Sequence, residues 1–419
     1  MFLTIPDADI LSAVRAQFKG VLPDQLGVAL SGGGDSTALL HILHQCLKPE
    51  GTVMFAATVN HGLREGAEAE ARQAAVLCDS LGIEHTLLYW RGWDLQGNLQ
   101  DQARRARYRL LTDWAKSKGI PVLAFGHTAD DQAETVLMRM ARASGVTGLS
   151  GMPVQRTVDG VTVFRPLLGI SRKMLRHYLE QHDIGWSEDP SNDDLRFERV
   201  RIRKAMEVLE PLGLTAMSIS QVAENVSKAR EALDWYTFLA ARDMTVVTAG
   251  SLMLDMRKFR TLPVETARRL LVRTMNWISG ADYPPRRTAV GDALEAIRGG
   301  QSLTLHGCRV LSRGNHSWIC RELQAVRDLA VPAGLKWDGR WHLHGGDVTG
   351  CEIRPLGELG LRECKEWREM GLPREVLMVS PALWKGTELV AAPLAGWANG
   401  WDAQLDGGHE EFFASLLSH

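Results

Sequence analysis

Residues 26–40 read Leu-Gly-Val-Ala-Leu-Ser-Gly-Gly-Gly-Asp-Ser-Thr-Ala-Leu-Leu, and this stretch decides the fold. Its apolar start is typical of a buried strand, and the apolar residues after Ser36 have the spacing of a helix. Glycines let the backbone approach a ligand closely, and the free N–H groups at the start of a helix bind anions. The stretch therefore predicts a strand, a phosphate-binding loop at Ser31–Ser36 and a helix.

The loop differs from the Walker A pattern, G-x-x-x-x-G-K-S/T, because no lysine follows its glycines. Asp35 and Ser36 stand in that place. A carboxylate beside a phosphate is costly unless a metal ion bridges the two. Asp35 is thus the candidate ligand of a Mg²⁺ ion, and an ordinary glycine-rich turn is the simpler alternative.

Composition limits the class of protein. The chain has 419 residues, a net charge of −2 and 45% hydrophobic residues, which is ordinary for a globular protein of two or three domains. Any nucleic-acid site must be a local patch, because the chain as a whole is not basic. Six cysteines without a C-x-x-C pair and a start without signal-peptide features predict a cytoplasmic location. No run approaches the ~18 apolar residues of a membrane span.

The first half of the chain alternates between two kinds of segment. Short apolar runs of strand length lie at 26–30, 52–59, 83–90 and 122–125. Helical patterns lie at 36–46, 67–81, 99–118 and 131–143. This alternation predicts an α/β fold with a doubly wound parallel sheet, in which ligands bind beyond the carboxyl ends of the strands.

The later texture differs, and it predicts two further domains. Residues 216–300 look mostly helical, with helices expected at 222–242 and 264–278, whereas residues 301–419 are richer in Gly, Trp and Pro. We expect a catalytic domain at 1–215, a helical middle domain at 216–325 and a small mixed α/β C-terminal domain at 326–419.

Two polar motifs follow the early strands. His61 and Arg64 end the second strand, where a nucleotide could be held, although a loop or capping role explains His61 nearly as well. Arg104 and Arg107 are three residues apart and share a helix face. Arginine suits phosphate contacts, and a solvated basic face is the alternative.

Two later motifs carry more charge. Asp131 and Glu134 follow a strand end and converge on one helical turn, where they could hold Mg²⁺ or a cationic substrate group. Acids in a first turn also simply stabilise a helix. The basic stretch 199–204, with Phe197 beside it, could bind a nucleic-acid backbone or could be a solvated face.

In this order, the motifs resemble those of the tRNA(Ile)-lysidine synthetases, a bacterial family of pyrophosphatase-loop enzymes. The resemblance covers residues 26 to about 204 and includes Arg165-Pro166-Leu167-Leu168 and Asp189-Pro190-Ser191-Asn192. The later regions resemble the longer members only loosely. Asn60 stands where the family usually has Asp, and Val200 where it usually has Asn.

The resemblance implies an adenine nucleotide alpha-hydrolase-like fold, with ATP and Mg²⁺ as cofactors. It implies ligation of free L-lysine to C2 of the wobble cytidine in isoleucine tRNA with a CAU anticodon. The reaction would pass through adenylated tRNA, release pyrophosphate and AMP, and change the codon read from AUG to AUA.

The resemblance also assigns roles to the residues named above. ATP would be bound by Ser31, Gly32, Gly33, Gly34, Asp35, Ser36 and His61. Catalysis would rest on Asp35, Asp131, Glu134 and Arg104, and tRNA would contact Arg64, Arg107, Arg199 and Arg203.

Two other functions stay open. A tRNA 2-thiolation enzyme of the same family would need catalytic cysteines near the site, and only Cys46 and Cys78 lie in the N-terminal domain. A tRNA-binding protein with a vestigial nucleotide site would be expected to lose the acids at 35, 131 and 134. No feature decides the oligomeric state, and a homodimer is one option.

Overall fold

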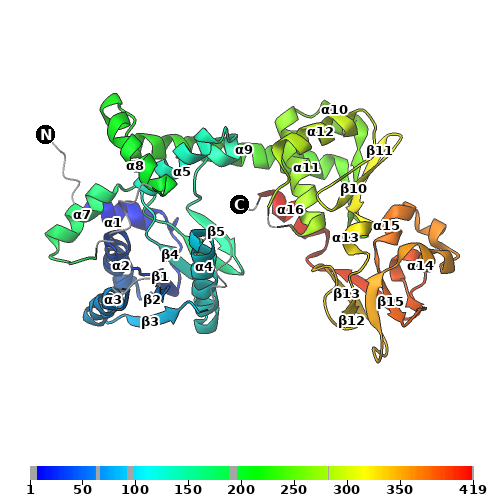
Figure 1. Cartoon of the computed structure of the whole chain (residues 1–419), viewed down its shortest axis with the longest axis horizontal. Coiled ribbons are helices and arrows are strands. Elements are labelled where there is room, and N and C mark those ends of the chain that lie inside the picture. Colours follow the sequence, from blue (N-terminus) through cyan, green and yellow to red (C-terminus); the bar gives the residue numbers. More distant parts are fainter. Residues whose placement is uncertain (1–6, 63–66, 92–98, 188–195, 282, 418–419) are drawn as a thin grey trace. The chain divides into compact units, whose positions relative to one another are not determined.

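The computed structural model describes residues 7–62, 67–91, 99–187, 196–281 and 283–417. Contacts within the chain divide it into two compact units, with the boundary between Arg230 and Glu231 (Figure 1). The division into three domains with boundaries near 215 and 325 stays a prediction.

The first unit is built on a six-stranded sheet with the order β3-β2-β1-β4-β6-β5. Its strands are β1 (Gln25–Ala29), β2 (Val53–Asn60), β3 (Glu84–Tyr89), β4 (Val122–Phe125), β5 (Gln155–Val158) and β6 (Val161–Phe164). All neighbours pair in parallel except β5, which forms an antiparallel hairpin with β6. The predicted parallel sheet and its four strands are confirmed, and the hairpin is an addition.

Helices cover both faces of this sheet (Figure 1). They are α1 (Asp7–Ala16), α2 (Gly34–Leu47), α3 (Ala67–Leu81), α4 (Leu99–Lys118), α5 (Ala129–Ala141), α6 (Val146–Leu149), α7 (Arg172–Gln181) and α8 (Glu198–Leu209), with short 3-10 turns η1 (Lys48–Glu50) and η3 (Glu210–Leu212). One apolar core joins α1, α2, α3 and α7 to the sheet, and a second joins α4 to its other face. This two-sided burial explains why the strands read as continuous apolar runs.

Strand β1 lies at the point where the strand order reverses. The chain runs outward from β1 through β2 to β3, and then returns to place β4 on the opposite side of β1. Ligands bind outside the carboxyl ends of the strands at such a reversal. The glycine-rich loop follows β1 and the His127 segment follows β4, so both meet at this crevice.

The second unit contains more strand than predicted. Its helices are α9 (Ala216–Met244), which begins in the first unit, α10 (Met256–Thr261), α11 (Val264–Ser279), α12 (Arg287–Arg298), α13 (Leu323–Val326), α14 (Gly357–Glu363), α15 (Arg374–Met378) and α16 (Gly408–Leu417), with η4 (Trp367–Met370) and η5 (Pro393–Ala395). The helices predicted at 222–242 and 264–278 are confirmed within α9 and α11. Three sheets accompany them.

The largest of these sheets is antiparallel and has the order β7-β8-β11-β10-β9. It consists of β7 (Thr245–Thr248), β8 (Ser251–Asp255), β9 (Leu303–Leu305), β10 (Cys308–Arg313) and β11 (His316–Arg321). The other two join β12 (Val331–Pro332), β14 (Glu352–Pro355), β15 (Pro381–Lys385) and β16 (Glu388–Ala391), and β13 (Trp341–His344) with β17 (Asp402–Leu405). Strands β7 and β8 lie within the stretch expected to be helical; they are too short for a clear period.

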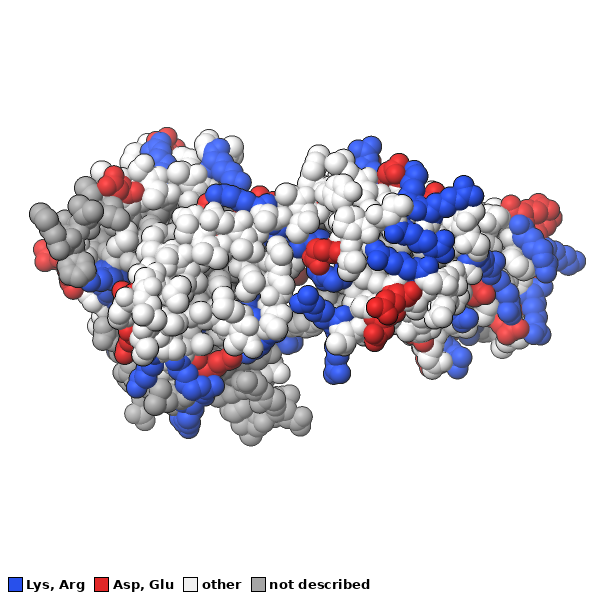
Figure 2. Space-filling model, turned by 90° about the horizontal axis from the view of Figure 1, so that it is seen from above, with Lys and Arg blue, Asp and Glu red and all other residues white. Residues whose placement is uncertain are grey.

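Basic side chains gather locally, as the near-neutral net charge requires. Figure 2 shows many Lys and Arg side chains over the second unit on the face that it presents. Helix α10, for example, exposes Arg257, Lys258 and Arg260. Within the described ranges, none of the helices has the length and apolar content to span a membrane.

Candidate functional site

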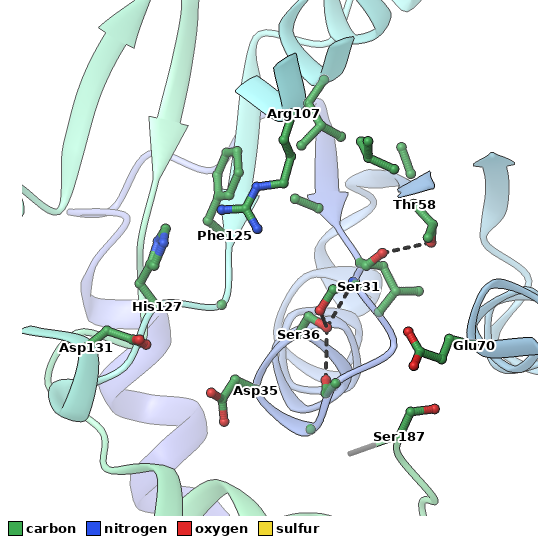
Figure 3. A pocket seen from close by; sticks show the side chains of 18 of the residues that line it. Ser31, Asp35, Ser36, Thr58, Glu70, Arg107, Phe125, His127, Asp131 and Ser187 are labelled. Atoms are coloured by element: carbon green, nitrogen blue, oxygen red, sulfur yellow. Dashed lines mark hydrogen bonds between the residues drawn. The ribbon is translucent and has the colours of Figure 1, made fainter. Parts of the chain in front are cut away.

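A cavity of about 690 Å³ opens at the carboxyl ends of β1, β2 and β4 (Figure 3). Ten of the residues predicted for the site line it: Ser31, Gly33, Gly34, Asp35, Ser36, His61, Arg107, Asp131, Arg199 and Arg203. Arg64 lies outside the described residues, as does the motif at 189–192. The fold thus brings together motifs that are up to 172 positions apart, since Ser31 and Arg203 line one space.

The glycine-rich loop leaves backbone donors free at the start of α2. Ser36 Oγ donates to the Gly33 carbonyl at 2.9 Å and accepts from the Ser31 N–H at 3.1 Å, which closes the turn. Gly32 has a φ of 81°, which favours glycine. No side chain caps the N-terminus of α2. Its first N–H groups are therefore available to an anion.

A guanidinium that the sequence analysis did not assign lies at the centre of the site. Arg172 Nε donates to Asp35 Oδ2 at 3.0 Å, and its Nη2 donates to Asp131 Oδ1 at 3.3 Å. Its Nη1 lies 3.8 Å from Glu134 Oε1. Burial lowers the pKa of Arg172, but the carboxylates of Asp131 and Asp35 outweigh it and hold the pKa above its ordinary value. Arg172 thus joins all three predicted acids.

A second unassigned arginine covers the loop. Arg176 Nη1 donates to Asp35 Oδ1 at 3.2 Å, and its guanidinium lies 5.3 Å from the Trp186 ring. A Cβ on Gly34 would lie 1.7 Å from Arg176 Nη1, so the glycine admits this close approach. Burial raises the pKa of Asp35 above its usual value, although Arg172 and Arg176 oppose the shift. The sequence signal for both was Ser171, a helix cap, followed by arginines four residues apart.

Asp131 has a structural role and also faces the cavity. Its Oδ2 accepts from the Thr128 N–H at 2.9 Å, and Thr128 Oγ1 accepts from the Asp131 N–H, which forms a capping box. Its Oδ1 is the atom that meets Arg172. Burial raises the pKa of Asp131, but Arg172 and His127 outweigh it, so the pKa lies below its usual value. Helix stabilisation, the simpler explanation, therefore accounts for one of the two oxygens.

Glu134 presents a buried oxygen without a hydrogen-bond partner. Its Oε1 accepts from Arg203 Nε at 2.6 Å, whereas its Oε2 is buried and makes no hydrogen bond. Burial is the main reason why the pKa of Glu134 lies above its usual value. A buried carboxylate oxygen of this kind is suited to accept a hydrogen bond or a proton from a cationic ligand.

The remaining predicted residues lie around these groups. Arg107 lies beside Phe125 in Figure 3, and its Nε makes no hydrogen bond. Arg199 Nη1 lies 4.0 Å from Asp131 Oδ1. Arg104 is exposed and is not part of the cavity lining. The ring of His61 packs edge-on against Trp90, with 5.7 Å between centroids.

His127, quoted in the sequence motif without a role, also lines the cavity. Burial lowers its pKa to about 3, so its imidazole is neutral near pH 7. Its ring stacks on Phe125 with 5.9 Å between centroids. A neutral ring in this place supplies shape and hydrogen-bonding atoms, and it is a poor proton acceptor.

The two departures from the family pattern have simple structural roles. Asn60 is buried, and its Oδ1 accepts from the Gly62 N–H at 2.8 Å, which shapes the turn after β2. Val200 is also buried. Its position fits an apolar side chain and requires no polar contact.

The site fits a metal ion shared with a phosphate rather than one held by the protein alone. No group of three or more His, Cys, Asp or Glu side chains suited to a metal occurs within the described ranges. Each Asp35 oxygen accepts one arginine hydrogen bond and keeps a further lone pair. Mg²⁺ typically takes one or two carboxylates and completes its shell with phosphate oxygens and water.

Comparisons with known proteins agree with this geometry. The family model described as PP-loop domain matches residues 8–209. A tRNA(Ile)-lysidine synthase of Ruegeria pomeroyi is 53% identical over 420 residues, which cover both chains completely. That of Wolbachia pipientis wMel is 33% identical over 383 residues and 88% of each chain. Among solved structures, the U34-tRNA thiolase NcsA from Methanococcus maripaludis is 20% identical over 52% of this chain and 78% of its own, with a TM-score of 0.47.

Proposed function

The chain belongs to the tRNA(Ile)-lysidine synthase family, and from this premise we propose how its pocket forms lysidine. It is an ATP-using ligase that acts on tRNA. The proposed substrates are ATP, free L-lysine and the wobble cytidine of isoleucine tRNA with a CAU anticodon, in the cytoplasm. One observation carries the proposal: an uncapped helix start and a buried carboxylate with a free oxygen are joined through Arg172 at one cavity.

The first step is adenylation of the cytidine. The N–H groups at the start of α2 bind the triphosphate, and Arg172 and Arg176 lie beside it on Asp35. The C2 oxygen of cytidine attacks the α-phosphorus, the bond to the β-phosphate oxygen breaks, and pyrophosphate leaves. Such a step depends mainly on positioning and charge stabilisation. Asp35 would hold Mg²⁺, which neutralises phosphate charge when bound.

The second step is attack by lysine. The ε-ammonium binds beside Glu134 Oε2, the buried oxygen that makes no hydrogen bond. Glu134 accepts a proton from it, which its raised pKa favours. The neutral amine then attacks C2 of the adenylated cytidine, the C2–O bond breaks, and AMP leaves. Asp131, through Oδ1, supports the same cation.

A direct assay tests this proposal. The protein is incubated with ATP, lysine and isoleucine tRNA carrying a CAU anticodon, and the anticodon fragment is then weighed by mass spectrometry. We expect a lysine adduct on the wobble cytidine and one AMP per adduct. A tRNA whose wobble cytidine is replaced by uridine is the matched control. Absence of both adduct and AMP with the cytidine tRNA would refute the proposal.

The buried cysteines argue against a thiolation enzyme. Cys46 and Cys78 are both buried, and neither lines the cavity. Burial raises the pKa of Cys46 to about 11 and that of Cys78 to about 12, so neither thiol ionises readily at neutral pH. A vestigial site is also disfavoured, because all three predicted acids are present and bound to arginines.

The double substitution Cys46→Ala and Cys78→Ala separates these two enzyme classes. We expect lysine transfer within about twofold of the wild-type rate, because neither thiol reaches the reacting atoms. Initial rates of AMP release are measured on protein with an unchanged circular dichroism spectrum. A complete loss of activity in such folded protein would favour the thiolation class.

A further inference from the structure

Four arginines surround one tyrosine ring at the side of the cavity. The guanidinium carbons of Arg104, Arg107 and Arg156 lie 5.7, 5.9 and 5.9 Å from the centroid of the Tyr108 ring. Arg165 Nη2 donates to the Tyr108 hydroxyl at 3.4 Å. These residues come from α4, from β5 and from the end of β6, so the cluster exists only in the folded chain.

The cluster has no compensating carboxylates. Within the described residues, none of these four arginines forms an ion pair with Asp or Glu. Arg165 is buried and donates to the Pro153 carbonyl, so it secures the tyrosine. Arg104 and Arg156 are exposed, and their guanidinium groups make no hydrogen bond within the described residues. Like charges held together without acids repel, and an anion that binds them relieves the repulsion.

Tyr108 senses this positive field. Burial raises the pKa of its hydroxyl, but Arg165 and then Arg104 and Arg107 outweigh burial, so the pKa lies below its usual value. The ring itself holds the arginines through cation–π contacts. The tyrosine thus organises the cluster and does not neutralise it.

A row of rings connects the cluster to the cavity. Tyr108 stacks on Phe125 with 5.0 Å between centroids, and Phe125 stacks on His127. Arg107, Phe125 and His127 line the cavity, and Figure 3 shows them on one side of it. Arg104, Arg156 and Tyr108 are outside the lining, so the cluster continues that side of the cavity outward.

We propose that Arg104, Arg107 and Arg156, gathered around Tyr108, bind backbone phosphates of the tRNA anticodon loop next to the cytidine that enters the cavity. The inference rests on the proposed function. Arg156, on strand β5, is the new element of this site. RNA is favoured over the ATP triphosphate because the triphosphate has its own donors at α2, and because the exposed arginines lie beside the cavity. Phosphate contacts of this kind fix the register of an RNA without reading its bases.

The substitution Arg156→Gln tests the proposal. Binding of full-length isoleucine tRNA with a CAU anticodon is measured between 50 and 300 mM salt. We expect binding about threefold weaker or more near 150 mM salt, and a slope of log affinity against log salt smaller by roughly one. The Kd for ATP is expected to stay unchanged. The matched control is Arg109→Gln, an exposed arginine on α4 outside the cluster, and it should leave both quantities unchanged.

The outcomes separate the inference from its premise. An unchanged slope in Arg156→Gln, with tRNA bound normally, would overturn the phosphate site alone. A weaker affinity for ATP with unchanged tRNA binding would assign the cluster to the triphosphate and would also overturn it. Failure of the wild-type protein to bind this tRNA would overturn the proposed function together with the inference.

Discussion

Replacing Glu134 with glutamine is expected to stop lysine transfer while leaving tRNA adenylation in place. Glutamine keeps the shape of the side chain, but it removes the negative charge and the proton acceptor from Oε2, the buried oxygen without a hydrogen bond. Loss of a positioned proton acceptor costs about 100- to 10,000-fold in rate. We expect lysine transfer at least about 100-fold slower, with adenylated tRNA accumulating, as followed by labelled α-phosphate.

Two controls make this result specific. Glu84→Gln removes an exposed carboxylate on β3 that pairs with Lys118, and it should change neither step. A variant of Glu134 that lost adenylation and lysine transfer equally would show that the residue serves the nucleotide half of the site. That result would contradict the assigned role.

The same variant has an expected signature in stability. Since burial raises the pKa of Glu134 in the folded protein, its ionised form destabilises the fold at high pH. This cost is absent below about pH 4, where unfolded glutamic acid is protonated. It grows as the pH rises through the raised pKa. The melting temperature of Glu134→Gln relative to wild type should therefore increase from pH 4 to pH 8, and a decrease would contradict the linkage.

Replacing Gly126 with alanine is expected to damage the nucleotide half of the site. A Cβ at Gly126 would lie 2.9 Å from the Asp35 carbonyl oxygen and 3.0 Å from the Ser36 Cα. Both atoms belong to the backbone at the start of α2, so no flexible side chain can move aside. Overpacking of this kind costs about 1–3 kcal/mol, and a displacement of about 1 Å can cost roughly 100-fold in rate.

The measurement combines stability with nucleotide use. We expect the melting temperature to fall by several degrees and AMP release with tRNA and lysine to fall at least about 100-fold. Gly169→Ala is the matched control, because a Cβ there meets no atom within 4 Å and the backbone is not left-handed. Wild-type activity in Gly126→Ala would show that α2 tolerates the shift and that the loop geometry is less strict than the contacts indicate.

Much of the fold was predictable because its signals are local. Strand β4 and helices α3 and α4 have the predicted bounds, since an apolar run or a helical period can be read within one segment. The hairpin of β5 and β6 and the strands β7 and β8 were not predicted. These strands have four or five residues each, which is too short for alternation to stand out, and pairing with neighbours defines them.

The site divides in the same way. The glycine-rich loop, Asp131 and Glu134 could be named from sequence because each follows a strand end within a distinctive motif. Arg172 and Arg176 could not, since arginines four residues apart on a helix are usually solvated. Only the packing of α7 against α2 shows that they meet Asp35, 137 and 141 positions earlier in the chain.

The sequence by itself therefore determined the parallel sheet, the phosphate-binding loop and the family, because these depend on short patterns in a fixed order. The tertiary structure decided which charges meet: one guanidinium among three carboxylates, a buried glutamate oxygen left without a hydrogen bond, and arginines from α4 and β5 around Tyr108. The physical reason is that ionic contacts depend on distance in space. Residues far apart in sequence approach each other only when the sheet order and helix packing place them there.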